Sequence, residues 1–449
     1  MIINDTICAV ATAHGVGGIS IVRLSGDKAV EIAKKITVKN NFKPRYAHLC
    51  NLYDKDSSLI DEAIVIYFKN PKSFTGEDVV EFQSHGGFVT ASRIVDTCIF
   101  YGARSATPGE FTKRAVLYGK MDFAQAEAAA KLIESKSVEA AKILSSQLKG
   151  ELQEFVNDLR DKLVEILAFI EVNIDYAEED LPKELNDRIK EKLDNIYRIL
   201  EKSMQASKRR AGVIEGYKVA IIGKPNVGKS SLLNALLSYE RAIISDIAGT
   251  TRDTVEENIN IGTHLVKIVD TAGIRESKDE IEKIGIKRSV KAIEESDVVI
   301  AMFDASEEFD RDDEEILKLL KRYRQSKEII TVMNKADLKS KIDYRLLKRL
   351  DPVSISVQKD SSKITNKLEK LLDTKSLGED TILITKRQLD TTQKALEAIK
   401  RSFEHLTSKE LELFAYEINE AIDSICAITK PFYREEILDK MFSNFCLGK

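Results

Sequence analysis

The stretch KVAIIGKPNVGKSS, residues 218–231, decides the fold of the middle of this 449-residue chain. It combines an apolar strand, a G-x-x-x-x-G-K-S loop and the start of the amphipathic helix LLNALLS. Gly223 and Gly228 allow backbone N–H groups to turn inward, and the following helix presents its positive N-terminal end to an anion. The stretch therefore predicts a phosphate-binding P-loop, in which Lys229 reaches the β- and γ-phosphates and the Ser230 hydroxyl ligates Mg²⁺.

Short apolar strands alternate with amphipathic helices from Tyr217 to about Lys375, which predicts a mostly parallel sheet with helices on both faces. The motif DTAG follows one strand, and there Asp270 can hold Mg²⁺ through water while the Gly273 N–H senses the γ-phosphate. The motif NKAD follows a later strand, and Asp337 can pair with the N1 and N2 donors of guanine, which adenine lacks. The order of the three motifs predicts a GTP-hydrolysing domain.

Two features distinguish this predicted GTPase domain from the Ras type. Ile274 follows DTAG where Ras-type switches place a water-orienting Gln. Thr250 and Thr251 in SDIAGTTRD supply hydroxyls for the first switch, and one of these hydroxyls is expected to ligate Mg²⁺. Arg252 in the same segment can be an internal arginine finger or part of a surface ion pair. The expected nucleotide-binding residues are Gly223, Asn226, Val227, Gly228, Lys229, Ser230, Ser231, Ser245, Asp246, Ile247, Ala248, Gly249, Thr250, Thr251, Asp270, Thr271, Ala272, Gly273, Asn334, Lys335 and Asp337.

The segments around this unit predict two more domains. Residues 1–119 hold short β-branched runs broken by Gly and Pro clusters, as in a mixed α/β domain. Apolar residues recur at helical spacing in residues 120–210 and 380–449. We expect the P-loop unit, residues 211–379, to be inserted into one helical domain, although two separate helical domains have the same pattern. The predicted fold class is a multidomain protein with an α/β N-terminal domain, an all-α helical domain and an inserted Ras-like P-loop α/β domain.

Composition and charge are those of a soluble globular protein, with 43% hydrophobic and 32% charged residues. The net charge of −4 argues against coating nucleic acid through overall charge, but it leaves a local basic patch open. The five cysteines lack the spacing of a zinc site or disulfide framework, which fits a reducing cytoplasm. With no basic signal-peptide region and no apolar run of membrane-spanning length, we expect a cytoplasmic protein without a membrane partner.

Four segments outside the P-loop unit are distinctive. They are DTICAVATAHGVGGISIVRLSG, SFTGEDVVEFQSHGG, PGEFTKRAVLYGKMDFAQAEA and the C-terminal FCLGK. With these segments in this order, the sequence resembles the tRNA-modification GTPase family called MnmE or TrmE from end to end. The chain departs from the family at Ala13 and His14, at Val116 and Tyr118, and at SISV, residues 354–357, where the guanine loop is expected. The resemblance implies that the chain, in a heterotetramer with the flavoprotein MnmG, adds an aminomethyl-type group such as carboxymethylaminomethyl to C5 of the tRNA wobble uridine.

The resemblance also implies a homodimer formed through the N-terminal domain, which is similar to folate-dependent one-carbon enzymes. The positions that match the family's site for a 5-formyltetrahydrofolate derivative are Arg23, Glu81, Lys120 and Lys449. Arg23 and Lys120 suit the carboxylates of a glutamyl tail, and Glu81 suits donors on a pterin ring. Structural ion pairs are the alternative for these residues.

The family further resembles GTPases that use K⁺ in place of an arginine finger. The implied K⁺ ligands are Asn226, Ser245, Ile247 and Thr250, and the expected Mg²⁺ ligands are Ser230 and Thr251. Glu282 matches a family glutamate that orients water through an intermediary. The alternative is that Glu282 lies on a solvated helix face and has no catalytic role. The expected catalytic residues are Glu282, Asn226 and Lys229. Cys446 is either a nucleophile or part of a tail that lines a pocket.

Two other function classes remain at this stage. A regulatory or ribosome-assembly GTPase of the Era kind would use the same three nucleotide motifs. A folate-dependent aminomethyltransferase would use the N-terminal domain and keep the GTPase for regulation. The N-terminal segments and the FCLGK tail favour the tRNA-modification GTPase, because an assembly GTPase is expected to carry an RNA-binding module instead.

Overall fold

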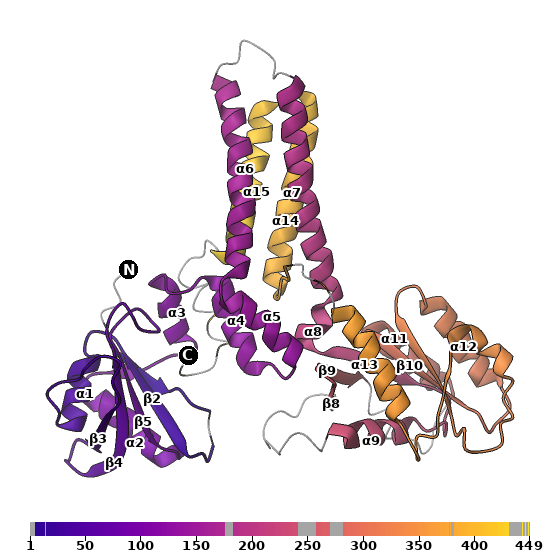
Figure 1. The fold of residues 1–449 in the computed structure, drawn as a ribbon, viewed down its shortest axis with the longest axis horizontal. Helices are drawn as coiled ribbons and strands as arrows, with labels where there is room; N and C mark the ends of the chain where they lie inside the picture. The colour runs from indigo at the N-terminus through magenta and orange to yellow at the C-terminus, as the bar shows by residue number, and fades with distance from the viewer. Residues whose placement is uncertain are drawn as a thin grey trace. The chain divides into compact units, whose positions relative to one another are not determined.

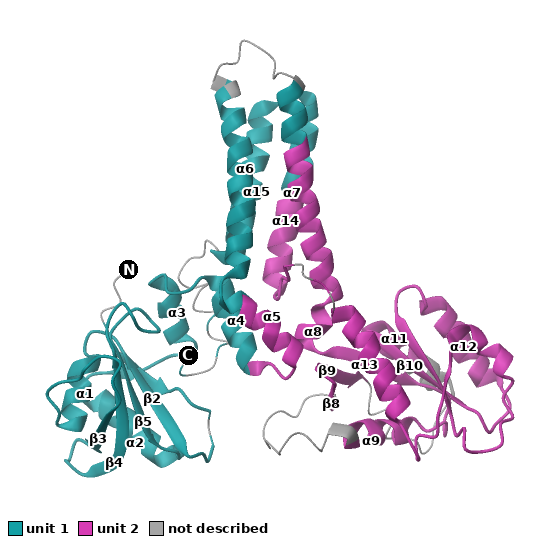
Figure 2. Ribbon diagram, in the orientation of Figure 1, with its two compact units in different colours: residues 1–133, 147–190, 397–449 teal, residues 134–146, 191–396 magenta. Residues whose placement is uncertain are grey.

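The structure is a computed structural model that divides into two compact units (Figure 2). Residues 1–133, 147–190 and 397–449 form the first unit, and residues 134–146 and 191–396 form the second. The structure describes residues 5–13, 15–175, 183–240, 257–269, 282–376, 378, 381–430, 442, 445 and 448. The four domain boundaries expected from the sequence stay predictions.

Six strands of the first unit form one sheet in the order β3-β4-β5-β2-β1-β6 (Figure 1). Neighbouring strands are antiparallel except β1 and β6, which are parallel. The strands are β1 (Ile7–Val10), β2 (Ile19–Ser25), β3 (His48–Tyr53), β4 (Leu59–Phe68), β5 (Val79–His85) and β6 (Arg104–Ser105).

The two faces of this sheet have different coverings, because side chains alternate along each strand. Cys8, Val22 and Phe82 point to one face and share a buried core with helices α1 (Ala29–Thr37) and α2 (Phe88–Phe100). On the opposite face, Ile7 and Ala9 pack against Phe111 of helix α3 (Glu110–Leu117). Arg23 pairs in register with Ala9 on one side and Glu81 on the other, so these two charged residues lie on the face of α3.

The second unit contains the expected α/β fold, a sheet in the order β12-β11-β10-β7-β9-β8. All neighbours are parallel except β8 and β9, so an antiparallel edge strand that the sequence analysis did not predict completes the sheet. The strands are β7 (Tyr217–Ile222), β8 (Glu257–Ile261), β9 (His264–Val269), β10 (Val298–Asp304), β11 (Glu328–Asn334) and β12 (Val353–Ser354).

Helices cover both faces of this sheet, as expected. Apolar residues of α9 (Lys229–Glu240) and α13 (Ser362–Ser376) fill the core on one face. Apolar residues of α11 (Glu282–Glu295) and α12 (Arg311–Tyr323) fill the core on the other. Because β7, β10 and β11 are parallel, the loops that follow them lie at the same edge of the sheet. The loop after β7 is the P-loop, and the loop after β11 carries NKAD.

The remaining helices confirm the helical stripes expected from the sequence. They are α4 (Phe123–Glu134), α5 (Val138–Leu148), α6 (Glu151–Asp175), α7 (Lys183–Arg209), α8 (Ala211–Glu215), α14 (Lys386–Ser408) and α15 (Leu411–Thr429). Within the first unit α6 packs against α15, with Leu163 and Ile166 buried on α6 and Phe414 and Ile418 buried on α15. Among the described residues, no helix is long and apolar enough to cross a membrane.

Candidate functional site

The P-loop joins the end of β7 to the start of α9 through three residues with left-handed backbone. The φ angles are +155° at Gly223, +64° at Asn226 and +101° at Gly228. A side chain at Gly223 would place its Cβ 2.7 Å from the backbone O of Met302, and one at Gly228 would collide with the side-chain amide of Asn334. Both glycines are therefore required by close approach as well as by backbone angle.

Lys229, the first residue of α9, turns its ammonium into the loop. Its Nζ donates to the backbone O of Gly223 and to the backbone O of Lys224, each at 2.8 Å. An ammonium has three donors, so these two bonds leave one for a phosphate oxygen. Burial lowers the pKa of Lys229 to about 8, because desolvation disfavours the charged ammonium. The site thus places a partly desolvated cation where phosphates are expected.

Lys224, the second residue of the P-loop, is held by the start of α12, a contact that the sequence analysis missed. Its Nζ lies 2.8 Å from Asp310 Oδ2, 2.8 Å from Asp313 Oδ2 and 3.4 Å from Glu307 Oε2. Asp310 and Asp313 also form the capping box of α12. Burial opposes the charge of Lys224, but the hydrogen bonds of the two aspartates outweigh it and raise its pKa. The loop carbonyl that Lys229 contacts therefore belongs to a residue fixed by an ion cluster.

Asn334, the first residue of NKAD, joins two loops of the site. Its Nδ2 donates to the backbone O of Val227 at 2.8 Å, and its Oδ1 accepts from the backbone N of Val357 at 3.0 Å. The residue is buried, so the structure satisfies both ends of its amide. Asn334 thereby couples the P-loop to the SISV segment.

Asp337 lies at the exposed end of the same loop. The Ser356 hydroxyl donates to its carboxylate and lowers its pKa, and Lys359 adds a smaller contribution from 3.3 Å. The backbone N of Ala336 donates to the backbone O of Ile355 at 2.9 Å, which keeps NKAD and SISV together. The carboxylate is thus ionised and accessible, as pairing with two guanine donors requires.

The other expected nucleotide, metal and catalytic residues lie partly inside and partly outside the described ranges. Ser230 and Ser231 lie in the first turn of α9, beside Lys229. Glu282 is the first residue of α11, but its side chain lies outside the described part. The residues that lie wholly outside the described ranges are Ser245, Asp246, Ile247, Ala248, Gly249, Thr250, Thr251, Arg252, Asp270, Thr271, Ala272, Gly273 and Ile274.

In the first unit, two of the expected folate residues contact each other. Arg23 on β2 donates from Nε and Nη2 to Oε1 of Glu81 on β5, both at 2.9 Å. The Arg23 guanidinium also lies 5.0 Å from the centroid of the Phe74 ring and 5.7 Å from that of Phe111. Lys120 donates to the backbone O of Pro71 at 2.9 Å. The loop of Pro71 and Phe74 thus contacts both basic residues.

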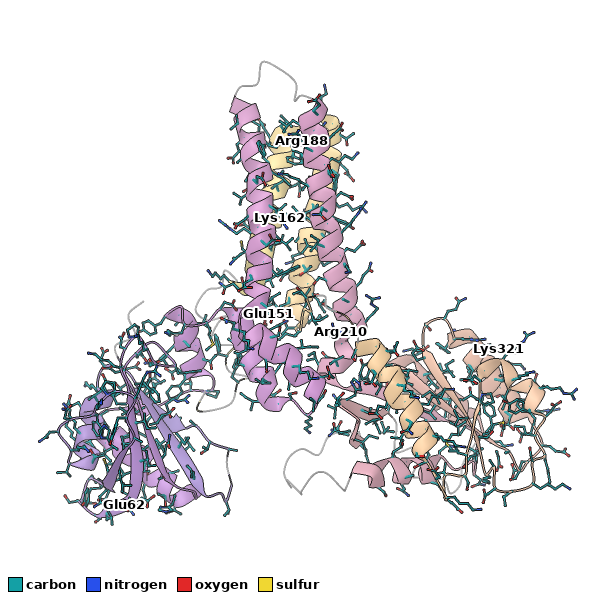
Figure 3. All side chains as sticks on the ribbon, in the orientation of Figure 1. Glu62, Glu151, Lys162, Arg188, Arg210 and Lys321 are labelled. Atoms are coloured by element: carbon teal, nitrogen blue, oxygen red, sulfur yellow. The ribbon has the colours of Figure 1, made fainter. Side chains whose placement is uncertain are left out.

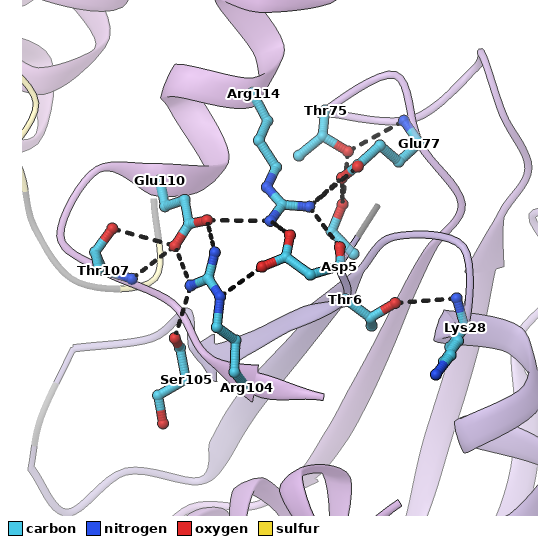
Figure 4. Close-up of polar contacts among 11 residues, drawn as sticks. Asp5, Thr6, Lys28, Thr75, Glu77, Arg104, Ser105, Thr107, Glu110 and Arg114 are labelled. Atoms are coloured by element: carbon cyan, nitrogen blue, oxygen red, sulfur yellow. Dashed lines mark hydrogen bonds and ion pairs between the residues drawn. The ribbon is translucent and has the colours of Figure 1, made fainter. Parts of the chain in front are cut away.

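A buried ion cluster anchors that loop and α3 (Figure 4). The fully buried Arg114 contacts Glu77 at 3.0 Å, Asp5 Oδ1 at 2.6 Å and Glu110 at 3.0 Å. Burial would raise the pKa of Glu110, but hydrogen bonds from Arg104, from the Thr107 backbone and from Arg114 lower it to about 2. Since Glu77 ends the loop that carries Phe74, this cluster holds the aromatic surroundings of Arg23 in place.

The C-terminal tail reaches the same unit. Phe442 packs edge-on against Phe123, with ring centroids 5.5 Å apart. Gly448 has a φ angle of +87°, and a side chain there would collide with the backbone O of Val10 at the end of β1. Gly448 therefore lies against the end of β1. Cys446 and Lys449 lie outside the described residues.

A cavity of about 440 Å³ lies at the start of β2, between the loop before it and α2. Thr12, Ser20 and Ser92 supply hydroxyls to its lining, and Val16 and Phe88 add apolar side chains to it. Val16, Ile19, Phe88 and Val89 are 104%, 65%, 76% and 70% exposed. An apolar group this exposed is typical of an interaction surface.

The chain matches two family models along most of its length. Residues 6–120 match the model of the GTP-binding protein TrmE N-terminus, and residues 123–446 match that of the MnmE helical domain. The tRNA modification GTPase MnmE of Sulfurimonas denitrificans is 56% identical and covers 99% of this chain and 100% of its own. The protein with the same description from Nitratiruptor sp. is 58% identical, covering 99% of each chain.

The likeness to a solved structure is partial. The crystal structure of Era in complex with MgGDPNP and nucleotides 1506–1542 of 16S ribosomal RNA is 32% identical. The matched region covers 40% of this chain and 66% of the Era chain, with a TM-score of 0.26. This likeness is too limited to decide the function, whereas the two relatives above match this chain over almost its full length.

Proposed function

The chain belongs to the MnmE family of tRNA modification GTPases, and from this premise we propose that GTP hydrolysis at its P-loop serves the modification of the tRNA wobble uridine. The modification adds an aminomethyl-type group, such as carboxymethylaminomethyl, to C5 of the base. It is made in a heterotetramer with the flavoprotein MnmG, in the cytoplasm, and its one-carbon unit comes from a folate. The domain boundaries that go with this function are 1–119, 120–210, 211–379 and 380–449.

The observation that carries the nucleotide assignment is the pairing of a glycine-shaped loop with the desolvated Lys229. Two carbonyls of the loop hold the ammonium, and its third donor is left for the β- and γ-phosphates. Ser230, in the first turn of the next helix, suits Mg²⁺ together with Thr251. Mg²⁺ supplies the charge that neutralises the phosphates when it is bound. Asp337 selects guanine, because its ionised carboxylate pairs with two donors that adenine does not have.

The P-loop also suits a monovalent cation. Asn226 lies in the middle of the loop, where it is exposed and has a left-handed backbone conformation. We propose that its oxygen ligates K⁺ together with Ser245, Ile247 and Thr250, and that the loop carrying these residues orders when two nucleotide domains meet face to face. K⁺ supplies positive charge to the phosphates in the absence of an arginine finger. Glu282 then orients the attacking water through an intermediary.

For the folate, the residues present form a suitable polar and aromatic group. Arg23 and Glu81 offer a cation and an acceptor between the rings of Phe74 and Phe111. Lys120 contacts the loop that carries Phe74 through the backbone O of Pro71, and Lys449 follows Gly448, which lies against the end of β1. Arg23 and Lys120 bind the glutamyl carboxylates, and Glu81 accepts from the pterin. The homodimer forms through the same domain, which the four exposed apolar residues beside the cavity support.

The deciding experiment is mass spectrometry of wobble nucleosides from cells that lack the protein. Cells with the wild-type chain should contain the modified uridine, and cells with no chain or with Lys229→Ala should contain the unmodified base. Normal modification in the deletion strain, together with a defect in ribosome assembly, would instead identify a GTPase of the Era kind. Hydrolysis of GTP by the purified chain, measured in parallel, separates the enzyme from its role in modification.

A further inference from the structure

A strongly basic segment lies in the second unit, beyond the nucleotide site. Residues 318–350 contain eleven Lys and Arg against three Asp and Glu, although the whole chain has a net charge of −4. The segment comprises the end of α12, β11 and two short 3-10 helices, η1 (Tyr344–Leu346) and η2 (Lys348–Leu350). Its charge is therefore opposite to that of the chain as a whole.

Packing brings the two ends of this segment together. Leu320 of α12 shares a buried core with Ile342 and Leu347, which flank η1. The guanidinium of Arg324 donates from Nη2 to the backbone O of Arg349 at 3.4 Å. The cations that end α12 and those around η2 are thus neighbours in the fold.

Four of the eleven cations are held by neighbouring groups. Their partners are Glu314 for Lys318, Asp304 for Lys335, Asp343 for Arg345, and the backbone oxygens of Glu294 and Ser296 for Lys327. The other seven are exposed and have no carboxylate partner among the residues that the structure describes. These seven, which we name the basic surface, are Lys321, Arg322, Arg324, Lys339, Lys341, Lys348 and Arg349 (Lys321 on α12 is labelled in Figure 3).

Such a surface fits a phosphate backbone better than a protein. Crowded cations without counter-ions repel one another, so an anion that binds them relieves this repulsion. The cores of protein interfaces are depleted of lysine, whereas phosphate contacts are made by exposed Lys and Arg. Tyr344, 47% exposed between these cations, adds a ring that can stack on an unpaired base. By contrast, the exposed Arg198 on α7 has a carboxylate partner, Asp194, at 2.7 Å.

We propose that the basic surface binds the phosphate backbone of the tRNA on which the family acts. The inference rests on the tRNA substrate of the family, and it is independent of the folate and potassium assignments. The surface belongs to the nucleotide-binding unit, so this unit contacts the tRNA itself in addition to hydrolysing GTP.

The test uses the full-length chain without nucleotide and labelled tRNA, with affinity measured by fluorescence anisotropy over a series of NaCl concentrations. The test variant removes four cations of the basic surface whose side chains have no partner among the described residues. Its substitutions are Lys321→Gln, Lys341→Gln, Lys348→Gln and Arg349→Gln. A control variant removes the same charge from exposed positions elsewhere in the chain. Its substitutions are Lys28→Gln, Lys34→Gln, Lys394→Gln and Lys400→Gln.

The test variant should bind tRNA at least about tenfold more weakly at low salt, and its slope of log affinity against log salt should fall by about 3. Each lost phosphate contact removes about 0.7 to 0.9 from that slope, whereas the control should keep the wild-type slope. Equal affinities and slopes in the two variants would overturn the inference, and so would loss of MnmG binding with unchanged tRNA affinity, which would assign the surface to the partner. GTP hydrolysis of all three proteins, measured without tRNA, reports separately on the nucleotide site.

Discussion

The side-chain amide of Asn334 donates to the backbone carbonyl of Val227 across 2.8 Å, although the two residues are 107 positions apart in the chain. The same amide accepts from the backbone N of Val357 at 3.0 Å. One buried side chain therefore links the P-loop to the SISV loop, which lies beside Asp337, the residue proposed to select guanine. A change at one of these loops can reach the other through this residue.

Replacing Asn334 by Ala should weaken both loops. The substitution leaves the carbonyl of Val227 and the N–H of Val357 buried without partners, which costs about 1–3 kcal/mol for each unsatisfied group. We expect a lower denaturant midpoint for the second unit and at least about tenfold weaker binding of a fluorescent GDP analogue. The matched control is Thr331→Val on the same strand. The buried Thr331 hydroxyl has no hydrogen-bond partner among the described residues, so its loss should not destabilise the protein. Equal GDP affinities in the two variants would contradict the link.

Much of the fold could be predicted from the sequence, because the spacing of apolar residues within a short segment indicates whether that segment is a helix or a strand. The alternation of strands and helices around the P-loop and the helical stripes at Leu163 and Phe414 were confirmed. Strand β8 was not predicted, because ENINI carries a weak strand pattern and pairs only through its antiparallel neighbour β9. The motif spacing located NKAD, but the double hydrogen bond of Asn334 depends on where two distant loops meet.

Side-chain partners separated by long stretches of chain escaped the sequence analysis. The P-loop motif names Lys224 only as a variable residue, and its carboxylate partners are 86 and 89 positions away. Arg23 and Glu81 were expected to face a folate, and neither residue shows by itself that β2 and β5 place them in register. Such contacts follow from strand order, which a single sequence does not determine.

The ion cluster around Lys224 should be needed to position the phosphate loop. Lys224→Ala removes the cation between Asp310 and Asp313, so the two carboxylates repel each other and the carbonyl that holds Lys229 is freed. We expect GTP affinity to fall about tenfold, which corresponds to about 1.4 kcal/mol. Lys224→Arg should restore it, because a guanidinium can bridge both carboxylates. If Ala and Arg give the same affinity, measured by titration with a fluorescent GTP analogue, the cluster does not position the loop.

Binding of GTP should take up protons in a pH-dependent way. Burial lowers the pKa of Lys229 to about 8, so the neutral fraction of this side chain is larger at pH 8.5 than at pH 7.5. Phosphate oxygens favour the charged form and raise this pKa again. Proton uptake per site should therefore be larger at pH 8.5 than at pH 7.5, and affinity should fall as pH rises through the pKa of the free protein. Calorimetry in buffers of different ionisation enthalpy measures the uptake, and the same value at both pH values would contradict the role of Lys229.

The folate assignment can be separated from a structural role of the Arg23–Glu81 pair. Changing both residues to Gln removes the pair without leaving a single charge behind, so the fold should persist. We expect this double variant to hydrolyse GTP at the wild-type rate and to bind 5-formyltetrahydrofolate at least about tenfold more weakly in calorimetry. Unchanged folate affinity in the double variant would leave the pair with a structural role only.

Hydrolysis should depend on K⁺, because Ile274 stands where Ras-type switches place Gln and the developing charge on the phosphates needs a cation. Asn226 presents its amide from the middle of the P-loop with a φ angle of +64°, so its oxygen can replace one water of a monovalent ion. We expect GTP turnover at least about tenfold faster in K⁺ than in Na⁺ at equal ionic strength, and turnover per molecule that rises with protein concentration as nucleotide domains pair. Asn226→Ala should lose the response to K⁺, whereas Asn258→Ala, at an exposed position on β8, should keep it. Equal rates in the two salts, or a K⁺ response that survives in Asn226→Ala, would exclude this cation site.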